Sequence, residues 1–177
     1  PYGTELEVPE DPTRAADAEY TYTFAGWTPK IETVTGDATY KATYTKEANS
    51  YTLTYDLDGG EWENDTTYTY TKKYNEEVEV KADPTKTGYT FAGWTSAEVE
   101  VVNGKFTMPA KDVTLKAKWN VNKYTIKWVN WDDSEVRTDT EVPYGTELEV
   151  PEDPTRAADA QYTYTFKGWT PEVETVT

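Results

Sequence analysis

The six residues Tyr89-Thr-Phe-Ala-Gly-Trp94 recur twice in this chain, as Tyr22-Thr-Phe-Ala-Gly-Trp27 and as Tyr164-Thr-Phe-Lys-Gly-Trp169. The first and last copies lie within longer segments that are almost identical, because residues 1–35 and 143–177 differ at only four positions. The three Trp residues that end the motif lie 67 and 75 positions apart. Self-similarity at a fixed period is the signature of a repeat architecture, so the sequence predicts a tandem array of modules of about 70 residues.

The segments on either side of the motif define where each module begins and ends. An opening segment, Tyr51-Thr-Leu-Thr-Tyr55, is echoed by Tyr124-Thr-Ile-Lys-Trp128, and a closing segment at 113–119 is echoed at 38–44. We therefore divide the chain into the back part of a first repeat (1–47), a complete middle repeat (51–119) and a third repeat that lacks its last strand (123–177). The linkers contain neither Pro nor Gly, so neighbouring repeats are expected to be held close together.

Alternation of apolar and polar residues predicts mainly β modules. Aromatic or aliphatic residues alternate with Thr, Asp or Lys at 51–57, 67–71, 113–119 and 39–44, which indicates half-buried strands. Asp58-Gly59-Gly60 predicts a turn, because these residue types tolerate positive φ. Residues 11–18 and their copy from Asp153 combine an Asp cap, a Pro and several Ala, which predicts a short helical turn. Each module is thus expected to be a mixed sheet with one such turn, an α+β arrangement.

Composition limits the chemistry and the partners of the chain. Seventeen basic and thirty-three acidic residues give a formal net charge of −16, which disfavours nucleic acid and anionic membrane surfaces as partners. The chain has no His and no Cys, which removes imidazole and thiolate nucleophiles, disulfides and the usual transition-metal ligands. We therefore predict no enzyme activity, no cofactor and no catalytic or metal-binding residue.

Aromatic residues are expected to supply the core. Seven Trp, fifteen Tyr and four Phe make up 15% of the chain, and each such side chain can bury roughly 150–250 Å². In the middle repeat we expect Trp94 and Phe91 to be buried together with Leu53, Tyr55 and Leu115.

With these residues laid out, the modules resemble the Listeria-Bacteroides surface repeat, the type found as the B-repeat of internalins. The residues of the middle repeat that carry the resemblance are Asp58-Gly59-Gly60, Asp83-Pro84-Thr85-Lys86, Gly88-Tyr89-Thr90-Phe91-Ala92-Gly93-Trp94 and the strand at 113–119. The other two repeats are similar to a variant in which an Ala-Ala-Asp-Ala loop replaces the Lys-Thr-Gly turn. The resemblance implies a compact β-grasp-like module, without enzymatic activity, in tandem arrays on secreted or wall-anchored proteins of Gram-positive and some gut bacteria.

Four groups of residues have a functional alternative beside the structural one. The acids around the Gly-Gly turn could bind Ca²⁺, although Asp and Gly are ordinary turn residues. The aromatic motif could stack on a glycan, although its recurrence favours core packing. Paired acids on strands meet one requirement of acid–base catalysis, but a solvated face is the simpler interpretation. Lysines near two asparagines could form an isopeptide crosslink. The acids around the turn are Asp56, Asp58, Glu61, Glu63 and Asp65, and the aromatic motif is present in the three copies given above. The paired acids are Glu5/Glu7 and Glu147/Glu149, and the lysines are Lys116, Lys118 and Lys123, near Asn120 and Asn122.

The sequence favours a structural role over a binding role. We expect a non-catalytic stalk or spacer of an adhesin-like protein on the bacterial cell surface, anchored through segments outside this chain, which begins at Pro1 without a Met. The alternative is a module that binds a host protein or a glycan through exposed aromatic faces or edge strands. Because the first repeat lacks its opening strands and the third its closing strand, we also expect strand pairing between chains at these edges.

Overall fold

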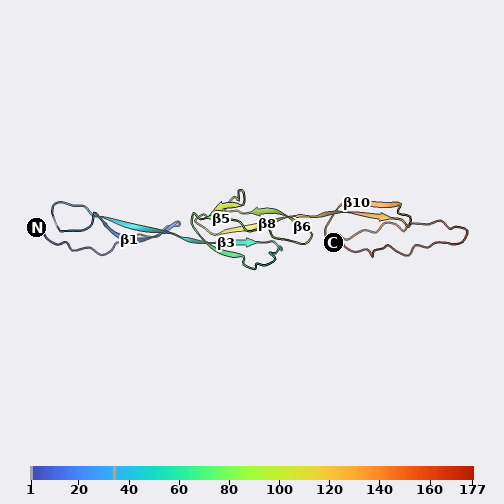
Figure 1. The fold of residues 1–177 in the computed structure, drawn as a ribbon, viewed down its shortest axis with the longest axis horizontal. Helices are drawn as coiled ribbons and strands as arrows, with labels where there is room; N and C mark the ends of the chain where they lie inside the picture. Colours follow the sequence, from blue (N-terminus) through green and yellow to red (C-terminus); the bar gives the residue numbers. More distant parts are fainter. Residues whose placement is uncertain (1, 34) are drawn as a thin grey trace. The chain divides into compact units, whose positions relative to one another are not determined.

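The computed structural model describes residues 2–33 and 35–177, and its regular elements are all β-strands (Figure 1). A mainly β fold, as predicted, is therefore confirmed. The strands are β1 (Tyr20–Thr28), β2 (Lys41–Ala48), β3 (Ser50–Asp56), β4 (Thr69–Lys73), β5 (Glu77–Glu79), β6 (Tyr89–Thr95), β7 (Lys105–Thr107), β8 (Val113–Val121), β9 (Lys123–Val129) and β10 (Glu135–Pro143).

The middle repeat contains a mixed four-stranded sheet in the order β4-β3-β8-β6. Strand β3 pairs antiparallel with β4, with Leu53 opposite Tyr70, and parallel with β8, with Leu53 opposite Val113. Parallel pairing requires a long crossover, and the residues between β3 and β8 supply it. A second sheet of two strands, β5 and β7, forms within that crossover, with Val78 opposite Phe106.

Most of the buried hydrophobic residues lie in the middle repeat, and Trp128 and Val176 are buried in the third. Leu53 is 1% exposed and Leu115 is fully buried, and Tyr55 is also buried, as predicted. Trp94 and Phe91 are only half-buried, so they lie at the border of this core. Residues of β5, β7 and β8 and Met108, which follows β7, supply much of the remaining core, and among them only Phe106 is aromatic: Val78, Phe106, Met108, Val113 and Ala117. The core is therefore less aromatic than composition alone indicated.

The predicted turn after β3 is present. Asp58 and Gly59 have φ of +49° and +83°, and the N–H of Gly60 donates to the carbonyl oxygen of Leu57 at 2.9 Å. A Cβ at Gly60 would lie 2.5 Å from the Trp119 ring, so glycine is required there by close packing. The turn does not lead directly into β4, because Glu61 first pairs with Thr85 in an isolated bridge.

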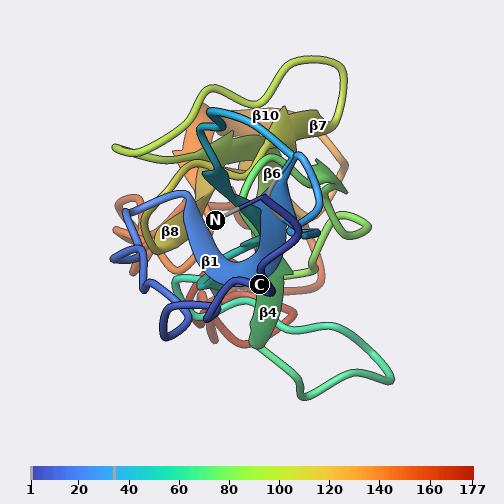
Figure 2. The same cartoon turned by 90° about the vertical axis from the view of Figure 1, so that its left-hand side faces the viewer.

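The predicted helical turn is wrong for the described residues. Residues 11–18 and 153–160 contain no helix and run as irregular chain. Residues 11–18 belong to the blue irregular segment before β1 in Figure 2. The Asp17 carboxylate accepts hydrogen bonds from the backbone N–H groups of Glu19 and Tyr20, at 2.9 and 2.8 Å. Such local bonds compete with helical ones, and a segment this short gains too few helical bonds to offset nucleation.

Outside the middle repeat, β1 pairs antiparallel with β2, and β9 pairs antiparallel with β10. By its internal contacts the chain divides into two compact units. One consists of Pro1–Asp56, Thr66–Ala82 and Trp94–Lys116, and the other of Leu57–Asp65, Asp83–Gly93 and Ala117–Thr177. The first predicted repeat boundary lies inside the former unit and the second inside the latter.

Candidate functional site: the repeat junctions

A single residue, Asn122, separates β8 from β9 at the second boundary between repeats. Its N–H donates to the carbonyl oxygen of Gly88 at 2.9 Å, and its carbonyl oxygen accepts the N–H of Tyr144 at 2.8 Å. Its side-chain Oδ1 accepts the hydroxyl of Thr90 at 2.7 Å. One residue thus connects the motif strand of the middle repeat to the start of the 143–177 segment.

Asn49 makes the same connections at the first boundary, between β2 and β3. Its N–H donates to the carbonyl oxygen of Glu19 at 2.9 Å, and its carbonyl oxygen accepts the N–H of Tyr74 at 2.7 Å. Its Oδ1 accepts the hydroxyl of Thr21 at 2.8 Å, and its Nδ2 also donates to the carbonyl oxygen of Asp17 at 2.7 Å. The junction is therefore a recurring structure, and we call each copy an asparagine junction.

Aromatic pairs accompany both asparagine junctions. The rings of Tyr20 and Tyr74 meet edge to face with centroids 5.5 Å apart, and those of Tyr89 and Tyr144 lie 6.2 Å apart. Such pairs contribute about 0.5–1.5 kcal/mol beyond the area they bury. Gly88, at φ +79°, has no Cβ and so leaves room for the ring of Tyr144.

The sequence contains a short motif that marks both junctions. Each junction reads Asn-x-Tyr, as Asn49-Ser-Tyr51 and as Asn122-Lys-Tyr124. The recurrence of an amide residue two positions before each opening strand could have identified it, because a residue that bonds through backbone and side chain together has few substitutes.

A second recurring cluster joins Arg, Asp and Tyr in the loop before the motif. The hydroxyl of Tyr22 donates to Asp17 Oδ2 at 2.7 Å, and the guanidinium of Arg14 lies 3.5 Å from the centre of the Tyr22 ring. The hydrogen bond from Tyr22, with those from the backbone, lowers the pKa of the Asp17 carboxyl below its usual value. This cluster fixes the loop where the helical turn was predicted.

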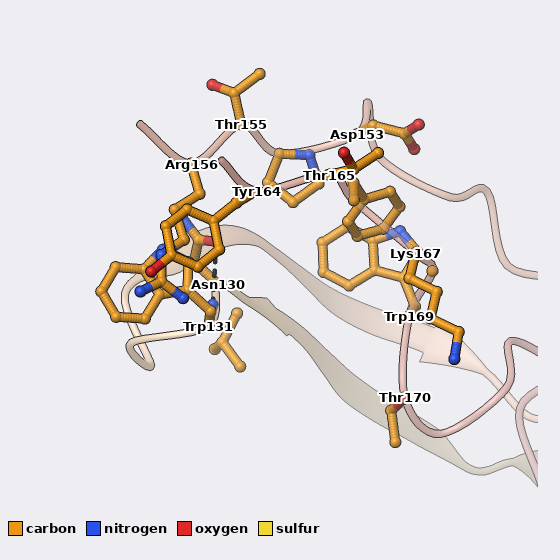
Figure 3. A pocket seen from close by; sticks show the side chains of 14 residues that line it. Asn130, Trp131, Asp153, Thr155, Arg156, Tyr164, Thr165, Lys167, Trp169 and Thr170 are labelled. Carbon is orange, nitrogen blue, oxygen red and sulfur yellow. Dashed lines mark hydrogen bonds between the residues drawn. The ribbon is translucent and has the colours of Figure 1, made fainter. Parts of the chain in front are cut away.

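The third repeat holds a copy of the cluster beside a cavity of about 710 Å³. The hydroxyl of Tyr164 donates to Asp159 at 2.6 Å, and this bond lowers the pKa of the Asp159 carboxyl. Arg156 stacks on two rings, at 3.6 Å from the centre of Tyr164 and 3.8 Å from that of Trp131. Figure 3 shows this stack at one end of the cavity and Trp169 at the other.

The acids at the Gly-Gly turn are not gathered as a metal site would require. Asp56 Oδ2 lies 3.8 Å from the ammonium of Lys116, and Asp58 Oδ2 lies 4.0 Å from that of Lys86. Across residues 2–33 and 35–177, no three carboxylates are placed to hold a metal ion. These contacts favour the turn interpretation over the Ca²⁺ alternative.

The other candidate residues are exposed to solvent or make structural contacts. Glu5, Glu7, Glu147 and Glu149 are exposed. Among the lysines considered for a crosslink, Lys123 pairs with Glu141 at 3.0 Å. The side-chain oxygen of Asn122, as described, accepts a bond from Thr90, which leaves its amide in a structural role.

The motif Trp packs against the opening strand in the middle and third repeats. Trp94 meets Tyr55 edge to face at 5.1 Å, and Trp169 meets Trp128 in the same way at 5.2 Å. All four rings are buried or half-buried. The contacts favour the core interpretation of the motif over a glycan-stacking platform.

Comparison with known proteins assigns this architecture of recurring β modules to a family. The family model of the Listeria-Bacteroides repeat domain matches residues 51–118 and 124–176. The chain therefore belongs to the Listeria-Bacteroides repeat family, in agreement with the resemblance seen in its motifs.

Curated relatives are longer proteins that contain similar segments. Internalin H of Listeria monocytogenes serovar 1/2a is 35% identical over 123 residues, which cover 68% of this chain and 20% of that protein. A protein of Evansella cellulosilytica described as a "Putative membrane protein" is 28% identical over 145 residues, covering 81% of this chain and 20% of that protein. The chain thus spans about a fifth of the length of these relatives. No solved structure gives a significant match. None of the described residues forms a helix long and apolar enough to cross a membrane.

Proposed function

We propose that this chain is a non-catalytic spacer segment of a bacterial cell-surface protein, in which tandem repeats set the distance between a functional domain and the cell. The surface location is supported by membership of the Listeria-Bacteroides repeat family and by the similarity to Internalin H. An adhesin-like role for the whole protein, with anchoring to the cell wall by segments outside this chain, belongs to the same proposal.

The observation that carries the spacer role is the asparagine junction. A spacer transmits distance only if neighbouring repeats resist bending at their boundaries, and few bonds cross a flexible linker. Here Asn49 and Asn122 each contribute backbone and side-chain bonds, and a tyrosine pair lies beside each. A linker of one residue also leaves little freedom between β2 and β3, or between β8 and β9.

The absence of a catalytic role is supported by residue chemistry. The chain contains no His or Cys, and the carboxyls of Asp17 and Asp159 have lowered pKa values, so they are poor proton donors near neutral pH. Their hydrogen bonds hold loops in place, which is a structural use of a carboxylate.

Insertion of one more repeat tests the spacer role. A second copy of residues 50–122, placed after Asn122, recreates an asparagine junction at each boundary. The compactness rule gives a 70-residue module a diameter of roughly 25–30 Å. We expect the maximum dimension measured by small-angle X-ray scattering to grow by about that amount. An unchanged maximum dimension would show that repeats fold back on one another and would contradict the proposal.

The surface location needs a separate experiment. Antibodies raised against the chain are expected to label intact bacteria that carry the whole protein, and external protease is expected to remove the label. Labelling only after the cells are opened would contradict the location without bearing on the junctions.

The alternative function, binding of a host protein or glycan through aromatic faces, has one feature in its favour. Trp131 is 61% exposed beside the cavity of the third repeat. Arg156 already covers one face of its ring, however, which leaves less of the flat surface that a sugar ring would need. Saturable binding in a glycan or host-protein screen, lost in Trp131→Ala, would favour this alternative.

A further inference from the structure

The first and last strands of the middle repeat lie side by side and run in the same direction. Strand β3 opens this repeat and β8 closes it, and the two pair in parallel register. The paired residues are Leu53 with Val113, Thr54 with Thr114, Tyr55 with Leu115 and Asp56 with Lys116. We call these pairs the terminal ladder. The strands through which the chain enters and leaves this repeat are therefore bonded directly to each other.

A pull along the chain reaches the terminal ladder through very little intervening backbone. One residue, Asn49, joins β2 to β3, and one residue, Asn122, joins β8 to β9. A chain that is held on one side of the repeat and pulled on the other is therefore loaded at the start of β3 and at the end of β8. Because the chain has no Cys, no disulfide can carry this load in place of the ladder.

The parallel direction of the two strands decides how that load acts on the ladder. The start of β3 and the end of β8 lie at opposite ends of the paired strands. Pulling on these two points slides the strands past one another, so the bonds of the ladder are stretched together and share the force. Pulling on two neighbouring ends would open the bonds one after another. The sliding geometry therefore gives the higher barrier, and the rate of crossing that barrier governs forced unfolding.

The terminal ladder is also shielded from water. In the sheet order β4-β3-β8-β6 it joins the two central strands, and β4 and β6 lie on its two sides. The side chains of Leu53, Val113 and Leu115 are buried beside it. A stretched hydrogen bond breaks more readily where water can replace the lost partner, and buried backbone groups lack that replacement. Burial thus adds to the resistance that the direction of the strands provides.

Side chains connect the same two strands at both ends of the ladder. The backbone N–H of Thr52 donates to Asp112 Oδ1 at 2.7 Å, directly before the ladder begins. At its other end, the ammonium of Lys116 lies 3.8 Å from Asp56 Oδ2. Contacts between exposed groups contribute little to equilibrium stability. Both of these contacts are nevertheless stretched when β3 slides along β8, so they oppose that movement.

We propose that the middle repeat is a load-bearing element, in which the terminal ladder resists tension applied along the chain. This inference rests on the spacer function proposed above, because a spacer under tension keeps its reach only while its modules stay folded. It also goes beyond that function, since a spacer that only sets a distance needs no particular direction of its first and last strands.

Single-molecule force spectroscopy on the full chain tests the dependence on the direction of loading. Because the chain has no Cys, a pair of introduced cysteines defines where the handles attach. Ser50→Cys with Asn120→Cys places the handles at opposite ends of the paired strands, whereas Ser50→Cys with Lys111→Cys places both where β3 and β8 begin. All three positions are exposed. At equal loading rates, we expect the first pair to unfold at roughly twice the force of the second or more.

Two matched variants with handles at 50 and 120 test whether the ladder is the source of the resistance. Asp112→Ala removes the bond to Thr52 between the two strands. Glu77→Ala removes an exposed ion pair of 3.0 Å to Lys105, which connects β5 to β7. We expect Asp112→Ala to lower the unfolding force and Glu77→Ala to leave it unchanged. Urea unfolding without force should give similar midpoints for both variants, because each loses an exposed contact, and it shows that each is folded.

The proposal is overturned if both handle pairs unfold at the same force, or if folded Asp112→Ala withstands as much force as Glu77→Ala. Either result would leave the spacer role standing, because the gain in maximum dimension expected from an added repeat is measured without force. Conversely, an unchanged maximum dimension would contradict the spacer role and would leave the difference in force between the two handle pairs unaffected.

Discussion

The backbone N–H of Tyr144 donates to the carbonyl oxygen of Asn122 at 2.8 Å, and the backbone N–H of Tyr74 donates to the carbonyl oxygen of Asn49 at 2.7 Å. Each bond links an asparagine that lies between two predicted repeats to a residue of the repeat that follows it. The boundaries between repeats are thus built from specific contacts.

Replacement of the junction asparagines should destabilise the chain by amounts that reflect their side-chain bonds. Asn122→Ala removes the acceptor for the Thr90 hydroxyl and should cost about 1 kcal/mol. Asn49→Ala also removes donors to two carbonyl oxygens and should cost more, about 2 kcal/mol. Urea unfolding followed by Trp fluorescence measures both, with the exposed Asn120→Ala as control. Equal, near-zero effects in all three variants would contradict this assignment.

The contact between Gly88 and Tyr144 can be isolated by a comparison of two glycines. Gly88 and Gly3 have φ of +79° and +82°, so a Cβ causes similar backbone strain at either position. Only at Gly88 would that Cβ meet another residue, the ring of Tyr144. We expect Gly88→Ala to lower the free energy of unfolding by about 1–3 kcal/mol more than Gly3→Ala. Identical losses would mean that the Tyr144 ring moves aside without cost.

Replacement of Leu115 by alanine tests how strongly the stability of the middle repeat depends on its aliphatic core. The side chain is fully buried, so Leu115→Ala should cost about 2–5 kcal/mol. Thr114→Ala on the exposed face of the same strand is the control and should change stability by less than about 0.5 kcal/mol. A calorimetric scan of each variant measures the difference, and a tolerated Leu115→Ala would place the core elsewhere.

The Asp17 carboxyl should respond to removal of the Tyr22 hydroxyl. Hydrogen bonds to the ionised carboxylate lower its pKa in the folded chain below the usual value of 3.8. They therefore stabilise the loop above the usual pKa, and this stabilisation is lost as the pH falls through the lowered one. Tyr22→Phe should raise the pKa of Asp17 toward 3.8, as read from its carboxyl ¹³C shift.

The same variant contains its own control. Asp159 keeps its bond from Tyr164 at 2.6 Å, so its pKa should be the same in Tyr22→Phe as in the parent. If Asp17 titrates identically in both chains, the Tyr22 hydroxyl does not cause the lowered pKa.

Much of the local structure could be predicted from residue patterns. The strand alternation at 51–57 and 113–119 corresponds to β3 and β8, and the Asp58-Gly59-Gly60 turn has the positive φ values its residues favour. The family also followed from motifs and their spacing. These features depend on short-range sequence, where residue type and backbone conformation are directly related.

The incorrect or missed predictions concern side-chain contacts that residue patterns alone do not reveal. Residues 11–18 have a helical composition, yet the Asp17 carboxylate bonds to the backbone after it and the Tyr22 ring stacks on Arg14. The asparagine junctions were missed because their partners, such as Asn49 and Tyr74, are far apart in the sequence. Trp94 is expected from the sequence to be buried with Leu115, but in the structure Leu115 is fully buried and Trp94 is only half-buried.

The sequence by itself determined the repeat, its strand-forming segments and its family, because periodicity and turn residues act locally. Only the tertiary structure decided which strand-forming segment became a strand. Residues 20–28 and 162–170 are nearly identical, yet β2 lies beside the first and no strand pairs with the second in the described chain. A strand is stabilised by hydrogen bonds to a neighbour, so its existence depends on what lies beside it as much as on its own residues.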